Sequence, residues 1–89
     1  MGTEPELNFA ELRRNIDALD AEIMRLVQHR AEVSRQVGRA RRASGGPRVV
    51  HQRELEIFAR YRQCLGREGD ELAALLLRLG RGHLGREPQ

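Results

Sequence analysis

The chain has no lysine, and all sixteen of its basic residues are arginine. The absence of lysine excludes a Schiff-base lysine and a lysine general base. Arginine instead favours planar, bidentate recognition of carboxylate or phosphate groups. A GC-rich genome explains the number of arginines but not their positions, so the positions carry the information.

Cysteine, aromatic residues and long apolar runs are also scarce. The single Cys64 excludes an internal disulfide and a cysteine-based metal site, and the three histidines lack ligand spacing. Motifs such as HExxH, a P-loop and GxGxxG are absent, so we expect no metal and no cofactor. The polar start MGTEPELN is not a signal region, and no run approaches membrane-spanning length. We therefore expect a cytoplasmic protein that makes no membrane contact.

The length of 89 residues predicts a single domain over 1–89, with flexible ends at 1–5 and 83–89. A chain of this size has a thin core, for which oligomerisation is a common remedy. Strict alternation and Asn-Gly hairpin signals are absent, which argues against strands. The fold class is therefore predicted to be all-α, with three helices per chain.

The first predicted helix, residues 6–43, carries an apolar seam. Its members follow at alternating steps of three and four residues: Phe9, Leu12, Ile16, Leu19, Ile23, Leu26, Arg30, Val33, Val37 and Ala40. Glu6 or Asn8 is the candidate N-cap, and Ser44-Gly45-Gly46-Pro47 ends the helix. At about 55 Å it is too long for a compact monomer of this size, so it needs a partner helix.

Two shorter helices are predicted after the first. The second runs over 49–65, with an apolar stripe at Val50, Ile57, Phe58, Tyr61 and Leu65. Gly66 and Gly69 break it, and Asp70 is the expected N-cap of the third helix. The buried face of that third helix is predicted at Leu72, Leu75, Leu76 and Leu79. We expect the segment 80–85, with three glycines, to fray.

Arg30 occupies a seam position where the pattern requires an apolar residue. A buried guanidinium must meet an anion, either in an internal salt bridge to Glu54 or Asp20 or in a bound ligand. Ser34 and Arg41 share this face, and Arg41 lies about 16 Å along the axis. Arg13 lies about 25 Å away, so it can join them only from an antiparallel partner helix.

The start of the second helix offers further polar groups. Val50 can supply a free backbone N–H, and Arg53 adds positive charge. Glu54 is a lone carboxylate that can accept a hydrogen bond from a substrate hydroxyl; a capping or ion-pair role is the alternative. Without a nucleophile paired to a base, an enzyme with these residues would work by positioning and electrostatics.

The sequence resembles the AroQ-type chorismate mutases over essentially its whole length. The motifs are Leu12-Arg13-Arg14-Asn15-Ile16-Asp17-Ala18-Leu19-Asp20, then Arg30, then Val37-Gly38-Arg39-Ala40-Arg41, then Arg53-Glu54. The loop 43–46 and the segment 79–82 are similar to the short actinobacterial subgroup. The resemblance implies an intertwined homodimer and a Claisen rearrangement of chorismate to prephenate, toward phenylalanine and tyrosine.

The resemblance also implies roles for individual residues. Arg13 of the partner chain and Arg30 would hold the substrate carboxylates, and Arg41 would lie close to the ether oxygen. The pair Arg53-Glu54 and the backbone at Val50 would lie near the ring hydroxyl. The full expected set is catalytic Arg30, Arg41 and Glu54, with substrate contacts from Arg13 of the partner chain, Arg30, Ser34, Arg41, Val50, Arg53, Glu54 and Ile57.

The chain departs from the family pattern at two points. Many relatives place a glutamine in the third helix as a second donor to the ether oxygen, and the matching stretch here is rich in glycine and arginine. Relatives often carry aspartate where Val50 stands. We therefore expect weak activity from the isolated dimer. The short subgroup can dock onto DAHP synthase and gain activity, with the glycine-rich tail reordering on docking.

Four alternatives remain open. Two are sister enzymes for similar dianions, a 4-amino-4-deoxychorismate mutase and an isochorismate pyruvate lyase. The third is a non-enzymatic helical adaptor, in which Arg30 would be a specificity device. The fourth is a nucleic-acid-binding dimer, suggested by the pI of about 10.4. Arg30 within the seam speaks against the fourth, and we expect no nucleic acid partner.

Overall fold

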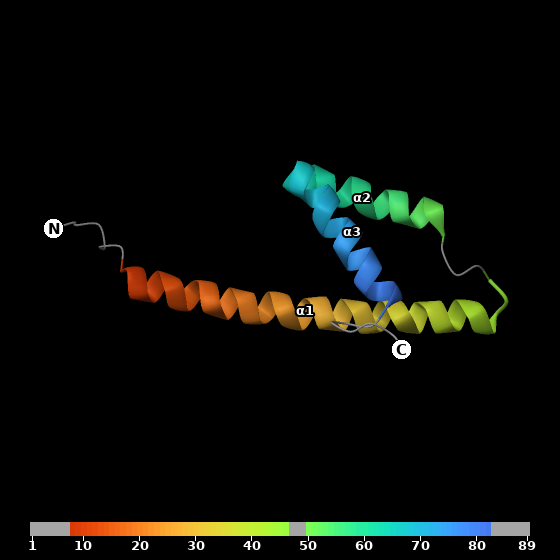
Figure 1. Cartoon of the computed structure of the whole chain (residues 1–89), viewed down its shortest axis with the longest axis horizontal. Helices are drawn as coiled ribbons and strands as arrows, with labels where there is room; N and C mark the ends of the chain where they lie inside the picture. Colours follow the sequence, from red (N-terminus) through yellow and green to blue (C-terminus); the bar gives the residue numbers. More distant parts are fainter. Residues whose placement is uncertain (1–7, 47–49, 83–89) are drawn as a thin grey trace.

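The computed structural model describes residues 8–46 and 50–82, and over these it contains three helices and no strand. They are α1 (Phe9–Ala43), α2 (His51–Leu65) and α3 (Arg67–Arg81). Figure 1 shows α1 as a long rod, with α3 crossing from α2 back to the rod. The all-α prediction is confirmed. Val49 and the ends predicted to be flexible, 1–5 and 83–89, lie outside the described residues.

Helix α1 begins at a side-chain cap and ends at a glycine. Asn8, one of the two candidate caps, accepts hydrogen bonds through its Oδ1 from the backbone N–H of Ala10 at 2.9 Å and of Glu11 at 3.2 Å. After Ser44 the chain turns through Gly45, whose φ of 82° favours a residue without a side chain. The 35 residues of α1 span about 52 Å.

The turn between α2 and α3 corrects one prediction, because Gly66, and not Asp70, caps α3. Gly66 has a φ of 73° and reverses the chain in a single residue. Asp70 lies inside α3 and accepts hydrogen bonds from Arg62, with Nη2 2.6 Å from Oδ2. Gly69 lies so close to the Tyr61 carbonyl oxygen that a Cβ would collide with it. The second glycine is therefore needed for helix packing rather than for the turn.

Helix α3 packs against both other helices, whereas α1 and α2 make no close backbone contact with each other among the described residues. Its buried residues are spaced at four, three and four: Gly69, Ala73, Leu76 and Gly80. The predicted face of Leu72, Leu75, Leu76 and Leu79 was therefore wrong except at Leu76, since Leu72 and Leu75 are exposed and Leu79 is only half-buried. Small residues form the contact because they allow the helix backbones to approach closely. The same contact continues the helix through Gly80 to Arg81, where we had expected it to fray.

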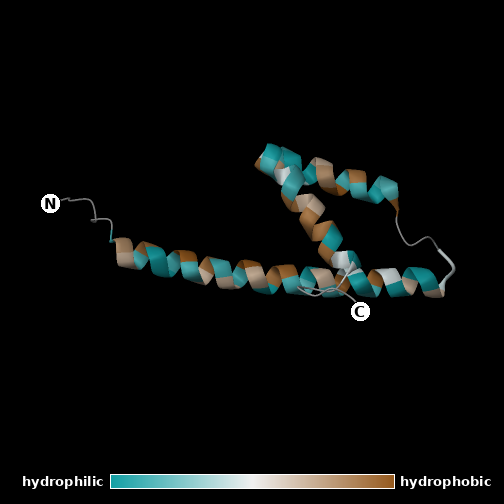
Figure 2. Ribbon diagram, viewed as in Figure 1, coloured by the Kyte–Doolittle hydropathy of each residue, from teal (hydrophilic) through white to brown (hydrophobic). Residues whose placement is uncertain are grey.

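Most of the apolar seam on α1 is uncovered within one chain. Phe9, Ile16, Leu19 and Ile23 are 55–82% exposed. Apolar residues recur along the whole rod in Figure 2. The radius of gyration is 18.2 Å, against about 12 Å for a compact domain of this length. No helix in the described part of the chain has both the length and the apolar character needed to cross a membrane.

Candidate functional site

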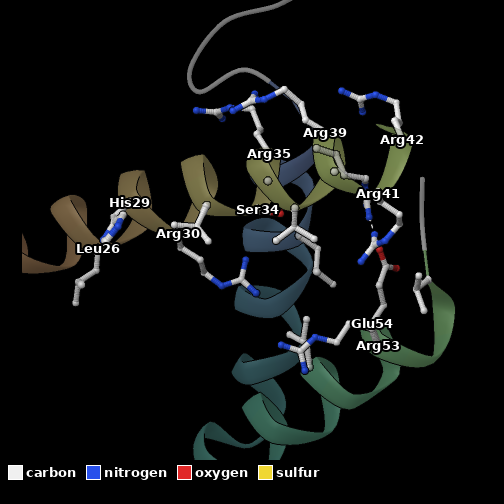
Figure 3. Close-up of a pocket in the computed structure, with 18 residues that line it drawn as sticks. Leu26, His29, Arg30, Ser34, Arg35, Arg39, Arg41, Arg42, Arg53 and Glu54 are labelled. Carbon is white, nitrogen blue, oxygen red and sulfur yellow. Dashed lines mark hydrogen bonds and ion pairs between the residues drawn. The ribbon is translucent and has the colours of Figure 1, made fainter. Parts of the chain in front are cut away.

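A pocket of about 640 Å³ lies where the second half of α1 faces the start of α2, with the end of α3 between them. Figure 3 shows Arg30 pointing from α1 into this space, with Arg53 and Glu54 on the α2 side. Because α1 and α2 are held apart by α3, the space between them is not filled by direct helix packing. The thickness and tilt of α3 therefore set the width of the pocket.

Seven of the eight residues expected at the site line this one pocket. They come from both helices: Arg30, Ser34, Arg41, Val50, Arg53, Glu54 and Ile57. The eighth, Arg13, does not line it and lies exposed in the first third of α1. It is 17 residues before Arg30, or about 25 Å along the same helix. Within one chain, Arg13 therefore does not reach the pocket.

Arg30 does not form the internal salt bridge that one interpretation of the sequence required. Glu54, one of its two candidate partners, is paired instead with Arg81, whose Nη1 lies 2.5 Å from Glu54 Oε2. Among residues 8–46 and 50–82, Arg30 has no ion pair or hydrogen bond from its side chain. It is half-buried, so its alkyl chain packs against protein while its guanidinium faces the pocket. This arrangement leaves the guanidinium available to an anion.

Sequence reasoning missed the contribution of α3. Leu77, Gly80 and Arg81 line the pocket from that helix, and Arg81 reaches the only carboxylate among the described lining residues. The signal was present in the small residues spaced at four, three and four, which extend the packed face of α3 to Gly80. His29 is exposed and lies at the edge of the pocket.

Seven of the eighteen lining residues are arginines, against one carboxylate, Glu54. Arg35, Arg39 and Arg42 point away from α2 (Figure 3). On that outer face Arg35 hydrogen-bonds to Glu32 and lowers the pKa of that carboxyl below its usual 4.5. Arg30, Arg41, Arg53 and Arg81 remain around the cavity. The described residues contain no group of three or more possible metal ligands. The four arginines around the cavity suit an anion with more than one negative group.

The comparisons point in one direction. Residues 12–79 match the family described as chorismate mutase type II. An intracellular chorismate mutase of Mycolicibacterium smegmatis is 57% identical over 81 residues, covering 91% of this chain and 76% of that protein. An intracellular chorismate mutase of Mycobacterium tuberculosis is 55% identical over 83 residues, covering 93% of this chain and 78% of that protein.

A solved structure is similar in fold as well as in sequence. It is a non-covalent complex of DAHP synthase and chorismate mutase from Corynebacterium glutamicum with a bound transition state analog. The matching chain superposes with a TM-score of 0.80 at 44% identity, and the match covers 86% of this chain and 93% of that one. At this identity the likeness extends beyond a shared helical architecture.

Proposed function

This chain belongs to the type II chorismate mutase family and is an isomerase of aromatic amino acid biosynthesis, and we propose that its rearrangement of chorismate to prephenate takes place in the arginine-lined pocket. The observation that carries the assignment of the site is the meeting of seven expected residues in one cavity. They come from positions 30 to 57, on α1 and at the start of α2, whose backbones make no close contact with each other in the described residues.

The chemistry of the reaction fits a site without a nucleophile. In the intramolecular rearrangement one C–O bond breaks and one C–C bond forms. The reaction needs no proton transfer and no cofactor. The enzyme holds the flexible substrate in its chair-like form, which removes the entropic part of the barrier. It also stabilises the negative charge that grows on the ether oxygen as the C–O bond breaks. Fixed guanidinium groups provide both effects.

We assign the residues as follows. Arg30 binds one substrate carboxylate and Arg41 stabilises the ether oxygen. Glu54 and the backbone N–H of Val50 bind the ring hydroxyl, with Arg53 beside them. Ser34 and Ile57 complete the wall through a neutral hydrogen bond and an apolar contact. Support comes from the position of all seven around one cavity, with Arg30 directed into it.

The working unit is a homodimer in which Arg13 of one chain completes the pocket of the other. Two observations support this: the exposed seam on α1 and the distance of about 25 Å between Arg13 and Arg30. An antiparallel partner related by a two-fold axis would bury both seams and form two equivalent mixed sites. The whole chain 1–89 then acts as one domain.

Docking to a DAHP synthase is part of the proposal. The similar chorismate mutase from Corynebacterium glutamicum is in a complex with such a synthase. Val50 replaces an acidic residue common in relatives, and we identify no third-helix glutamine as a second donor. The isolated dimer should therefore be slow, and the docked one faster. We also place the protein in the cytoplasm, because its relatives are named intracellular enzymes.

Loss of chorismate absorbance with the purified protein tests the activity directly. The assay should be run alone and with the synthase from the same organism, and equal rates would contradict activation by docking. Turnover of 4-amino-4-deoxychorismate and isochorismate, measured in parallel, decides the substrate. Preference for either over chorismate would assign the pocket to a sister reaction.

A further inference from the structure

An ion pair joins the end of α3 to the start of α2 across one side of the pocket. Arg81 Nη1 donates to Glu54 Oε2 at 2.5 Å, between residues 27 positions apart in the sequence. The other pair between helices, Arg62 with Asp70, lies at the α2–α3 turn, away from the cavity. Within the described residues, the Arg81–Glu54 pair is thus the only ion pair between helices at the pocket.

Contacts on both sides of Arg81 hold its backbone against α1. Gly80 is buried on Ser34, where a Cβ would lie 2.5 Å from Ser34 Oγ and 2.9 Å from Ser34 Cβ. Arg35 Nη1 donates to the Gly82 carbonyl oxygen at 3.2 Å. The last turn of α3 is therefore anchored on α1 while the Arg81 side chain reaches α2. This explains how an arginine on a helix end keeps a fixed place at the cavity.

The pair changes the charge that the pocket presents. Glu54 is the only carboxylate among the described lining residues, and its side chain is only 24% exposed. Solvent screens such a group less than a surface carboxylate. An unpaired Glu54 would repel a substrate with two carboxylates, whereas a paired one keeps an oxygen lone pair for a hydroxyl. Complementarity toward the dianion thus depends on a cation beside Glu54.

We propose that Arg81 is a positioning residue that masks the charge of Glu54 and holds its carboxylate at the α2 wall. The pocket then offers a hydrogen-bond acceptor to the ring hydroxyl without repelling the carboxylates. This inference rests on the proposed function, because it requires a dianionic substrate in this cavity. In this proposal Arg81, a residue of α3, contributes to substrate binding through its effect on Glu54.

Steady-state kinetics on Arg81 and Glu54 variants test the inference. Arg81→Ala should raise KM about tenfold and lower kcat no more than about threefold, since the loss of masking acts on the bound dianion. In a Glu54→Gln variant the side chain at position 54 has no charge to mask. The same Arg81→Ala change should then raise KM less than about twofold. Such non-additivity is the signature of two residues acting on one another.

Two further variants of Arg81 test whether its charge is what matters, and a variant of Arg78 serves as a matched control. Arg81→Lys keeps the charge and should stay within about threefold of the wild-type KM, whereas Arg81→Gln keeps a hydrogen-bond donor without the charge and should behave like Arg81→Ala. Arg78→Ala removes the same charge from an exposed position of α3 outside the pocket and should leave KM unchanged. Far-ultraviolet circular dichroism and size-exclusion chromatography confirm that each variant is folded and assembled.

The outcomes distinguish the inference from the function on which it rests. If the wild-type protein neither converts nor binds chorismate by calorimetry, the proposed function and the inference both fall. If the wild type is active and Arg81→Ala has an unchanged KM, only the inference falls. An equal KM increase in the wild-type and Glu54→Gln backgrounds would also overturn it, because Arg81 would then act on substrate or structure and not through Glu54.

Discussion

The two halves of α1 carry the same apolar spacing but have different surroundings. From Ala31 onward the helix packs against α3 of its own chain and the pocket opens beside this contact, although Val33 and Val37 of the seam stay 43% and 46% exposed. From Phe9 to Leu26 the seam is at least 41% exposed at every position. The C-terminal half of α1 thus finds part of its packing within the chain, whereas the apolar seam of the N-terminal half stays exposed. The pocket lies beside the C-terminal half and lacks Arg13, which lies in the N-terminal half.

The largest expected effect comes from separating Arg13 and Arg30 on different chains. Arg13→Ala and Arg30→Ala should each lower kcat/KM about 100-fold to 1,000-fold, because a fixed charge at the substrate is lost. After unfolding and refolding together, a 1:1 mixture should regain about a quarter of the wild-type activity, because half of the dimers are mixed and each has one intact site. The absorbance assay measures the recovery.

Failure to recover would show that Arg13 does not complete the pocket of the partner chain and would contradict the shared pocket. Size-exclusion chromatography of each single variant provides the control, because both must remain dimers. If Arg30→Ala instead dissociates the dimer, Arg30 is a structural element of the seam and not a substrate ligand.

The next effect concerns the exposed half of α1 alone. Leu19→Asp should abolish the dimer at micromolar concentration, since a buried unpaired charge costs several kcal/mol. Light scattering after chromatography measures the mass. Glu22→Ala changes an exposed residue that is paired with Arg25 on the same helix and should leave the dimer intact. A dimeric Leu19→Asp protein would show that the seam is not the interface.

Two glycines allow the tightly packed α2–α3 contact to be compared with the exposed surface of α1 in their effect on stability. Gly69→Ala should lower the free energy of unfolding by about 2 kcal/mol, because its Cβ would strike the Tyr61 carbonyl group. Gly38→Ala should instead raise it by about 0.5–1 kcal/mol, because the nearest atom is a flexible Arg42 Nη1 at 3.7 Å. Urea denaturation of the dimer at a fixed protein concentration measures both changes. Equal changes would contradict the tight α2–α3 packing.

The smallest expected effect is a pH dependence on the outer face of α1. Arg35 lowers the pKa of Glu32 below 4.5 in the folded chain, mainly through their hydrogen bond. The resulting stabilisation is present above the unfolded pKa and is lost as the pH falls through the lower folded value. Glu32→Gln should therefore reduce the slope of stability against pH below about pH 4.5. Thermal unfolding between pH 3 and 6 measures it, and an unchanged slope would contradict the shift.

Local sequence signals predicted the long first helix well. Asn8 caps it, and the glycines after Ser44 end it, because caps and turns depend on residues within a few positions. The same reasoning failed at Asp70, which is a good cap by residue type but pairs with Arg62 inside α3. It also failed for Leu72 and Leu75, because close approach between helices selects small residues that apolar spacing does not reveal.

The sequence by itself determined the helical class and predicted the arginine set and a partner helix, because these follow from residue type, periodicity and the rise of a helix. Only the tertiary structure decided that Glu54 forms its ion pair with Arg81 and that the Arg30 side chain has no partner among the described residues. The physical reason is that Gly66 and Gly69 set how α3 crosses between α1 and α2. That crossing brings residues 27 positions apart within hydrogen-bonding distance, which no local pattern specifies.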